Sequence, residues 1–342
     1  MFMLTPTKFM NRDATIYVAG HQGLVGSALL RQFKVLGYRN LLVRAHRELD
    51  LTNQNEVREF FARERPEYVF LAAAKVGGIL ANSTYPAEFI NQNLLLQTNA
   101  IHEAYRTGVK RLLFLGSSCI YPKHAPQPMK EEFLLTGPLE STNRAYAVAK
   151  ISGIEMCRSY NCQYGARFLA AMPPNLYGPG DHYDLENSHV IPALIRKMHE
   201  AKMCGADQVA IWGTGRPRRE FLYSDDAANA CVFLMNLPDE NLDTILANGH
   251  SFPLVNIGSG HELTIRELAE LIAEVVGFSG SLVFDASKPD GTPRKLLDMS
   301  RFAAMGWKPL TTLRQGLIKT YKDLLARQTP APGVRSVSTK AG

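Results

Sequence analysis

The first half of the chain alternates short apolar runs with longer amphipathic segments. The apolar runs are rich in β-branched and aromatic residues, and they predict buried strands at 15–19, 41–43, 68–71, 111–115 and 168–172. Apolar residues at helical spacing lie between them and predict helices at 24–36, 53–65, 86–106 and 142–164. Strands that are apolar throughout and joined by long helices indicate a parallel sheet covered on both faces. The pattern therefore predicts an α/β fold with a Rossmann-type doubly wound sheet.

The pattern changes after residue 172. Proline and glycine interrupt the chain at 173–175 and 178–180, and the apolar segments beyond them are shorter. The expected elements there are helices at 189–202 and 263–276, strands at 208–212 and 282–285, and a short element at 301–305. We therefore expect one unit over residues 1–174 and a smaller α/β unit over 175–328. Parts of 220–260, namely 221–235 and 254–257, are candidates to rejoin the main sheet, and 329–342 is expected to be a disordered tail.

Composition places the chain among ordinary globular proteins. Of its 342 residues, 46% are hydrophobic and 20% are charged, which excludes disordered and fibrous classes. No apolar run approaches the roughly 18 residues of a membrane span, and no secretory signal is evident, so we expect no membrane partner. The five cysteines form no CxxC pair. Their pattern argues against disulfides and against a metal site, and it predicts a reducing, cytoplasmic setting.

The chain is mildly basic, with 38 Lys and Arg against 32 Asp and Glu and a net charge of +6. Basic proteins often bind nucleic acid, but this chain has no long Lys/Arg run and no basic stretch interleaved with aromatic residues. Its short basic clusters, at 44–47 and 216–219, suit small phosphorylated ligands. We therefore expect no nucleic-acid partner.

Three glycines lie between the first predicted strand and the first predicted helix. Glycines at that junction permit a tight turn and a close approach of the backbone to a pyrophosphate, while the helix N-terminus offers amide donors. The alternative is a plain connecting turn, but the position at the first strand–helix junction favours a dinucleotide site. The residues expected there are Gly20, His21, Gln22, Gly23, Leu24, Val25 and Gly26.

The second predicted strand ends in Arg44, where NAD-dependent enzymes usually carry an acidic residue. Arg44, His46 and Arg47 precede the nearest aspartate, Asp50. Guanidinium groups suit the 2′-phosphate of NADP(H), so this segment favours NADP(H) over NAD(H). A solvated basic turn is the alternative interpretation.

Tyr146 and Lys150 lie one helical turn apart and therefore share a helix face. A nearby ammonium lowers the pKa of a phenol, so Tyr146 is expected to exchange a proton with a carbonyl oxygen near neutral pH. The spacing alone is weak evidence. Its position strengthens it, because Gly116, Ser117 and Ser118 end the preceding strand, and ligands of such sheets bind at the carboxyl ends of the strands.

Together, these motifs resemble those of the extended short-chain dehydrogenase/reductase superfamily, and longer strings resemble the GDP-L-fucose synthase family within it. The strings lie at 71–78, 82–86, 117–122, 187–192 and 288–294, and the resemblance covers residues 15–325. It implies an NADPH-dependent enzyme that converts GDP-4-keto-6-deoxy-D-mannose to GDP-L-fucose. It also implies a homodimer. Within each chain, residues 1–174 bind NADP(H) and residues 175–328 bind the substrate.

The resemblance also implies catalytic roles. Cys119 is the base and His189 the acid that invert C3 and C5, and Tyr146 donates a proton during reduction at C4, supported by Lys150 and Ser117. From the residues alone, Cys119 is equally a small buried apolar residue, and His189 is equally an ordinary helix-start residue.

Further contacts carried over from the family lie in both halves of the chain. Lys197 and Arg219 bind the GDP phosphates. Trp212 stacks on a base or sugar, and Asp290 accepts hydrogen bonds from hydroxyl groups. The alternative interpretations are that Lys197 is a solvated lysine, that Trp212 belongs to the core, and that the others are ordinary turn residues. The further cofactor contacts are Leu115, Gly116, Ser117, Ser118, Tyr146, Lys150, Pro173, Pro174, Asn175, Leu176 and His189.

The chain departs from the family pattern at three of these positions. Gln22 and His46 stand where the family often has arginine, so a preference for NADPH rests on Arg44 and Arg47. Pro174 stands where threonine is typical and supplies no side-chain donor.

Other functions remain open at this point. A nucleotide-sugar 4,6-dehydratase needs a pair of acids near the serine loop, which Ser118, Cys119 and Ile120 do not supply. A 4-epimerase retains tightly bound NAD after purification, which distinguishes it experimentally. A cofactor-sensing binding protein would share the fold but would have no need of an intact Tyr146 and Lys150.

Overall fold

The computed structural model describes residues 10–185, 188–246, 252–288 and 290–328. Its centre is a sheet of six parallel strands, as the apolar runs predict, so the expected doubly wound α/β fold is confirmed. In sheet order the strands are β2 (Leu41–Leu42), β1 (Ile16–Ala19), β3 (Tyr68–Leu71), β4 (Arg111–Leu115), β5 (Phe168–Met172) and β9 (Leu254–Asn256). The order reverses between β1 and β3, and such reversals open a crevice for ligands at the carboxyl ends of the strands.

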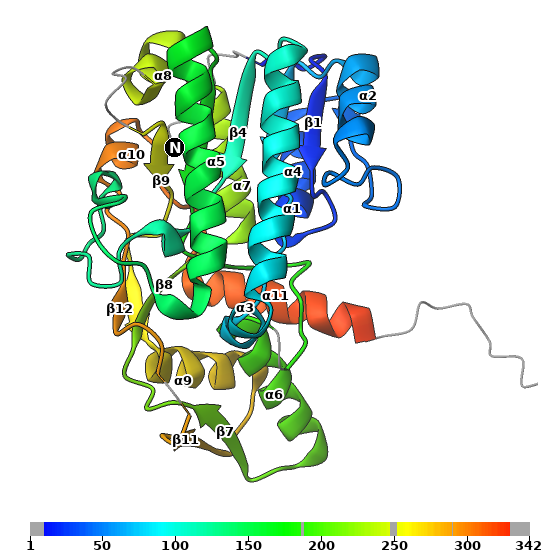
Figure 1. Ribbon diagram of the computed structural model, residues 1–342. Coiled ribbons are helices and arrows are strands. Elements are labelled where there is room, and N and C mark those ends of the chain that lie inside the picture. Colours follow the sequence, from blue (N-terminus) through cyan, green and yellow to red (C-terminus); the bar gives the residue numbers. More distant parts are fainter. Residues whose placement is uncertain (1–9, 186–187, 247–251, 289, 329–342) are drawn as a thin grey trace, which may run out of the picture.

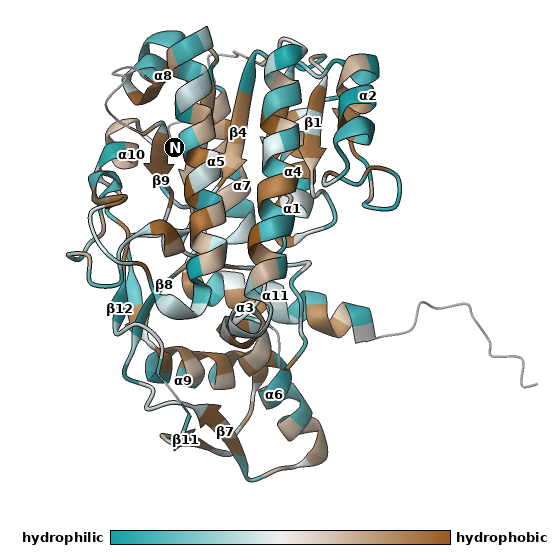
Figure 2. Ribbon diagram, in the orientation of Figure 1, coloured by the Kyte–Doolittle hydropathy of each residue, from teal (hydrophilic) through white to brown (hydrophobic). Residues whose placement is uncertain are grey.

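Helices cover both faces of this sheet (Figure 1). Tyr17 and Val69 point into the core beneath one set of helices, and Val18 and Phe70 into the core beneath the other, so β1 and β3 are buried on both faces. Figure 2 shows the resulting hydrophobic strands between helices with polar outer surfaces. The first set is α2 (Gln54–Glu64), α4 (Pro86–Arg106) and α5 (Arg144–Tyr164); the second is α1 (Leu24–Leu36), α7 (Ser224–Met235), α8 (Asp239–Leu246) and α10 (Ser300–Ala304).

A smaller body lies beyond the carboxyl ends of these strands (Figure 1). Its helices share one core that includes Ile195, Leu268 and Leu317. One sheet contains β10 (Glu262–Thr264), β8 (Arg218–Tyr223), β12 (Arg294–Lys295) and β6 (Asn175–Tyr177), and a second pairs β7 (Gln208–Trp212) with β11 (Ser281–Asp285). The helices are α6 (Val190–Cys204), α9 (Ile265–Val276) and α11 (Leu313–Gln328).

Short helices occupy several connections between these elements. They are α3 (Ile79–Thr84) and the 3-10 helices η1 (Ser118–Ile120), η2 (Glu131–Phe133) and η3 (Ser141–Asn143).

The two candidates to rejoin the main sheet behave differently. β9 pairs with β5 and extends the sheet, and α7 packs against α1 on one of its faces. Residues 221–223, however, belong to β8, which pairs with β6, β10 and β12 in the smaller sheet. The expectation that these residues return to the main sheet is therefore wrong. The proposed tail at 329–342 lies outside the described residues, as do Asn187 and Pro289 of the family strings. Of the helices described, none combines the length and apolar surface that crossing a membrane requires.

Candidate active site

Two glycines of the loop after β1, Gly20 and Gly26, are packed too tightly for a larger residue. Gly20 has φ +81°, and a Cβ atom there would lie 2.7 Å from the backbone nitrogen of Ala73 after β3. A Cβ atom on Gly26 would lie 2.0 Å from the carbonyl oxygen of Gly20. Helix α1 begins after Gly23, which has no side chain to cap it, so the first N–H groups of α1 are left for a ligand.

The rest of the loop also fits a dinucleotide. Gln22 and Gly23 are exposed, and Leu24 is half-buried above Val25, which belongs to the core. The Nδ1 atom of His21 is buried and has no hydrogen-bond partner within the described part of the chain. An unpaired buried polar atom beside an open helix N-terminus suits a ligand that carries phosphates and ribose hydroxyls.

The basic segment after β2 is only partly free to bind phosphate. Arg44 forms an ion pair with Glu64 (Nη2–Oε1, 2.8 Å) and lies over the Phe60 ring. His46 is exposed, with its Nδ1 atom 3.8 Å from Asp50 Oδ1, and Arg47 is exposed as well. Their contact with a 2′-phosphate stays a prediction, and Arg44 would have to share its charge with Glu64.

The fold brings the remaining expected cofactor residues to the ends of β4 and β5. The amide of Gly116 donates to Ala171 O (2.9 Å), and the amide of Ser118 donates to Pro173 O (3.1 Å). Lys150 reaches in from α5 and donates from Nζ to Leu115 O (2.8 Å). Pro174 follows Pro173 in the chain, and Asn175 and Leu176 are the first residues of β6 in the smaller body. This cluster therefore spans the junction between the two bodies.

Ser117, Cys119, Tyr146 and Lys150 form one group there. Ser117 caps η1 by accepting the amide of Cys119 at Oγ (3.4 Å), which fixes the thiol at the mouth of β4. The Nζ atom of Lys150 lies 5.7 Å from the centroid of the Tyr146 ring. Cys119 acts electrostatically on both Tyr146 and Lys150, so the thiol, phenol and amine share one environment. Cys119 is only 6% exposed.

Burial governs the protonation of the phenol and the amine. It raises the pKa of Tyr146, and a charged Cys119 would raise it further. Burial also lowers the pKa of Lys150 to about 8, against the influence of Cys119. The expectation that the phenol pKa is lowered is therefore wrong, because desolvation by burial is the main influence on it and acts in the opposite direction. Tyr146 is held protonated at neutral pH, the form in which it can donate a proton.

The charge environment of Cys119 includes a residue that sequence reasoning missed. Burial raises the pKa of the Cys119 thiol, while the Ser117 hydroxyl, Lys295 and Lys150 each lower it. Lys295 lies on β12, one position beyond the family string at 288–294. No local spacing connects it with Cys119, so only the three-dimensional fold reveals it.

His189 stands apart from this group. It is the residue before the first turn of α6, and its side chain is solvent-accessible although protein atoms surround it closely. Desolvation by this surrounding protein lowers its pKa. No side-chain contact among the described residues joins His189 to Cys119, so its role as the acid stays a prediction.

The expected substrate residues gather in the smaller body. The Nζ atom of Lys197 lies 5.1 Å from the ring centroid of Trp212, whose side chain is 54% exposed at the end of β7. Asp290 accepts hydrogen bonds from the amide (2.9 Å) and hydroxyl (2.6 Å) of Thr214, close to that tryptophan in sequence. Arg219 is electrostatically coupled to Asp290, while burial lowers its pKa. An exposed aromatic ring with a lysine ammonium beside it suits a nucleotide diphosphate.

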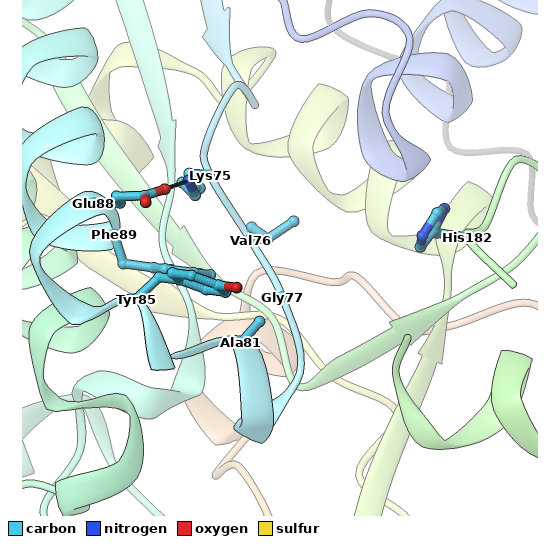
Figure 3. A pocket seen from close by; sticks show the side chains of 8 residues that line it. All are labelled: Lys75, Val76, Gly77, Ala81, Tyr85, Glu88, Phe89 and His182. Carbon is cyan, nitrogen blue, oxygen red and sulfur yellow. Dashed lines mark hydrogen bonds and ion pairs between the residues drawn. The ribbon is translucent and has the colours of Figure 1, made fainter. Parts of the chain in front are cut away.

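A cavity of about 440 Å³ is lined mainly by the segment after β3 and the first turns of α3 and α4. Figure 3 shows Tyr85 and Phe89 on one side of it and His182 approaching from the other, with the Lys75–Glu88 ion pair at its edge. The Phe89 ring meets the Tyr146 ring edge-on at 6.4 Å. Phe89 therefore lies between the cavity and the Tyr146 ring. Within the described ranges, no cluster of three or more His, Cys, Asp and Glu residues could hold a metal ion.

Comparisons with known proteins find relatives along almost the whole chain. A model described as the NAD dependent epimerase/dehydratase family matches residues 16–249. GDP-L-fucose synthase 1 of Arabidopsis thaliana is 58% identical over 311 residues, which are 91% of this chain and 93% of the relative. GDP-L-fucose synthase of Escherichia coli (strain K12) is 52% identical over 317 residues, which are 92% of this chain and 97% of the relative. The solved structure of a GDP-L-fucose synthetase from Naegleria fowleri bound to NADP aligns with a TM-score of 0.82 at 28% identity, over 93% of this chain and 96% of that chain.

Proposed function

Because the chain belongs to the NAD dependent epimerase/dehydratase family, we propose that it converts GDP-4-keto-6-deoxy-D-mannose to GDP-L-fucose with NADPH. The observation that carries this proposal is its identity of 52–58% with GDP-L-fucose synthases over more than nine tenths of each chain. The site adds chemical support. A simple reductase needs only the phenol and lysine, whereas Cys119 places a second proton-transferring group beside them.

Epimerisation uses the acidity that a ketone confers on neighbouring carbon atoms. The C4 ketone of the substrate acidifies the hydrogens at C3 and C5, so a base on one face and an acid on the other can invert each centre. In the proposed scheme the Cys119 thiolate removes each proton, and His189 returns a proton on the opposite face. Ser117 donates a hydrogen bond to the oxygen at C4 as negative charge develops there.

Reduction then uses Tyr146. NADPH, when bound, supplies the hydride that C4 requires. Tyr146 donates its proton to the C4 oxygen, and its raised pKa keeps that proton available throughout the neutral range. Lys150 donates a hydrogen bond to Leu115 O, which fixes its ammonium group next to the phenol and close to the expected nicotinamide ribose.

The two bodies of the molecule divide the binding of the ligands in this proposal. Residues 1–174, with β9 and α7, hold NADPH through the glycine loop and α1, while Arg44 and Arg47 favour its 2′-phosphate. Residues 175–328 hold the GDP portion, with Lys197 and Arg219 near the phosphates and Trp212 stacked on the base.

We also propose a cytoplasmic homodimer. The long helices α4 and α5 pack side by side on one face of the sheet, and Leu95 and Tyr164 leave apolar surface exposed there. The described cysteines are all free thiols, which suits a reducing compartment. Light scattering should give twice the 38.0 kDa mass of one chain. A monomer at micromolar concentration would contradict the dimer.

The function is tested by supplying GDP-4-keto-6-deoxy-D-mannose with either NADPH or NADH. We expect cofactor oxidation that is faster with NADPH, and NMR spectra of GDP-L-fucose. A product that keeps the original configuration at C3 and C5 would identify a plain C4 reductase. Purified protein that carries tightly bound NAD and consumes no NADPH would identify a 4-epimerase instead.

A further inference from the structure

The turn that carries Cys119 is short and is held at both ends. η1 is a single 3-10 turn whose three residues are all buried. At its start, the amide of Ser118 donates to Pro173 O, just beyond β5 (3.1 Å). At its end, Tyr121 caps the turn, and its amide donates to Ser118 O (3.5 Å). The position of the thiol therefore depends on how firmly Tyr121 is held.

The Tyr121 hydroxyl is fixed by a side chain in the protein interior. It donates to Oδ1 of Asn256 (2.6 Å), the last residue of β9. Both side chains are buried, so solvent has little access to this bond. Asn256 stands opposite Met172 in the ladder between β9 and β5. Both anchors of the turn therefore lie at the carboxyl ends of neighbouring strands of the main sheet.

Two further hydrogen bonds determine which way the Asn256 amide points. Its Nδ2 atom donates to Met129 O (2.9 Å) and to Asp298 O (3.2 Å). Backbone carbonyl groups only accept hydrogen bonds, so the NH₂ group must face them and Oδ1 must face Tyr121. Both amide donors and the amide oxygen are used. The Tyr121 hydroxyl is therefore restricted to one role, that of a donor to Asn256.

The segments that Asn256 joins come from both bodies of the molecule. Met129 belongs to the loop after η1, and Asp298 follows β12 of the smaller sheet. The backbones of these two segments also bind each other, because Met129 N donates to Leu296 O (2.7 Å) and Asp298 N donates to Met129 O (2.8 Å). The backbone amide of Asn256 donates to Glu131 Oε1 (3.0 Å). Asn256 thus lies where the main sheet, the loop after η1 and the smaller sheet meet.

We propose that Asn256 is a positioning residue for epimerisation, which acts through the Tyr121 hydroxyl to hold the turn that carries Cys119. The bond to Asn256 fixes the far end of η1, as the bond from Ser118 to Pro173 O fixes its near end. A misplacement of about 1 Å can cost a catalytic group about 10²-fold in rate. This inference rests on the proposed function, because it assumes that Cys119 is the base.

Tyr121→Phe tests the proposal, because it removes the hydroxyl and keeps the buried ring. Deuterium exchange at C3 and C5 of the substrate in D₂O should fall about 10- to 10²-fold, with little change in KM. Tyr177→Phe is the matched control, since it removes another buried tyrosine hydroxyl, which donates to Leu313 O (3.3 Å) in the smaller body. Both variants should unfold at lower urea concentration, but only Tyr121→Phe should lose exchange. Parental exchange in Tyr121→Phe, or equal losses in both variants, would overturn the proposal.

A double-mutant cycle tests whether the hydroxyl acts through Asn256. Tyr121→Phe combined with Asn256→Ala should lose no more exchange than Asn256→Ala alone, because each change breaks the same hydrogen bond. Losses that multiply in the double variant would show that the two residues act independently, which would contradict the proposal.

A second measurement does not depend on turnover. Cys119 is buried, so iodoacetamide should label it only when its turn opens, and peptide mass spectrometry distinguishes it from the other thiols. Labelling of Cys119 should be faster in Tyr121→Phe than in the parent chain and unchanged in Tyr177→Phe. An unchanged rate in Tyr121→Phe would contradict the anchoring of the turn. If labelling behaved as expected but the parent chain showed no exchange at C3 and C5, the proposed function would fail while the anchoring role of Asn256 survived.

Discussion

At the scale of single residues, the site separates two proton chemistries within one buried group. Tyr146 is held protonated by burial, which suits a donor, whereas Cys119 can act as a base only as a thiolate. Burial opposes that thiolate, and Lys295 and Lys150 favour it. Epimerisation and reduction should therefore respond to different substitutions.

Tyr146→Phe tests this separation. The variant keeps the ring that packs edge-on against Phe89 but removes the proton donor, so the rate of NADPH oxidation should fall about 10²- to 10⁴-fold. Deuterium exchange at C3 and C5 should persist, because Cys119 and His189 are untouched. Equal losses of exchange and reduction would contradict separate roles. Phe89→Leu, which removes the ring contact but keeps the phenol, controls for packing.

Sequence reasoning found the residues whose relation is local and missed those whose relation is not. Tyr146 and Lys150 are one helical turn apart and follow a serine loop at a strand end, so spacing and position together suggest them, whereas the role of Cys119 comes from the family resemblance. Lys295 influences the pKa of Cys119 although it lies far along the chain, on β12. The phenol pKa was misjudged for a related reason, because sequence does not reveal how completely a side chain is buried.

At the scale of elements, the junction of β1 and α1 determines where a dinucleotide can bind. Gly26 approaches the carbonyl of Gly20 so closely that the first turn of α1 lies directly on the loop. The open N-terminus of α1 depends on this contact, because a larger residue would push the helix away from the loop.

Gly26→Ala should therefore disturb both stability and cofactor binding. Its Cβ atom would meet Gly20 O at 2.0 Å, and relieving that overlap should cost about 1–3 kcal/mol of unfolding free energy. Denaturant unfolding and NADPH fluorescence titration measure the two effects. Gly23→Ala is the matched control, because its Cβ atom would lie 3.4 Å from the same oxygen and should cost less. Equal losses in both variants would contradict the close-approach argument.

The pattern of apolar residues was sufficient for long elements and insufficient for short ones. Helices α1 and α4 and strands β3, β4 and β5 have the predicted bounds, because each combines a regular apolar pattern with clear ends. Strands β6, β10 and β12 have three residues or fewer. Such strands form because a distant partner is present, and their own sequence carries too little pattern to predict them.

At the scale of the whole molecule, the loop at 178–181 ties the two bodies together. A Cβ atom on Gly180 would lie 3.1 Å from the Ser27 hydroxyl on α1, and the Gly180 amide donates to Asp323 on α11 (3.1 Å). Asp181 is buried next to Arg327 of α11, and its Oδ2 atom has no hydrogen-bond partner among the described residues. Helix α11 thus reaches back to the loop that borders the cofactor helix.

Asp181 should make the stability of the molecule depend on pH. Burial raises its pKa from 3.8 to about 7, so between these values the folded protein binds a proton that the unfolded chain releases. The unfolding free energy should therefore fall as pH rises from about 4 to 7. Asp181→Asn should remove this fall and stabilise the protein by roughly 2–4 kcal/mol above pH 7.

Urea unfolding at several pH values checks this expectation. Asp323→Asn, which removes the neighbouring carboxylate that accepts from Gly180, should bring no such gain and serves as the control. An Asp181→Asn variant as pH-dependent as the parent chain would contradict the assignment.

The parallel sheet could be predicted from sequence, but the junction between the two bodies could not. Strands that are apolar throughout require a cover on both faces, which fixes the α/β class. The position of helix α11 and the contacts of Asp181 depend on segments that are distant in sequence, so no periodic pattern predicts them.

The central claim is that one buried group inverts two carbon centres before it reduces a third. The most direct measurement is turnover of GDP-4-keto-6-deoxy-D-mannose with NADPH in D₂O, followed by NMR of the product from the wild-type chain and from Cys119→Ser. The account predicts GDP-L-fucose labelled at C3 and C5 from the wild-type chain, and no label at either carbon with Cys119→Ser. Label at both positions with Cys119→Ser, or at neither with the wild-type chain, would contradict it.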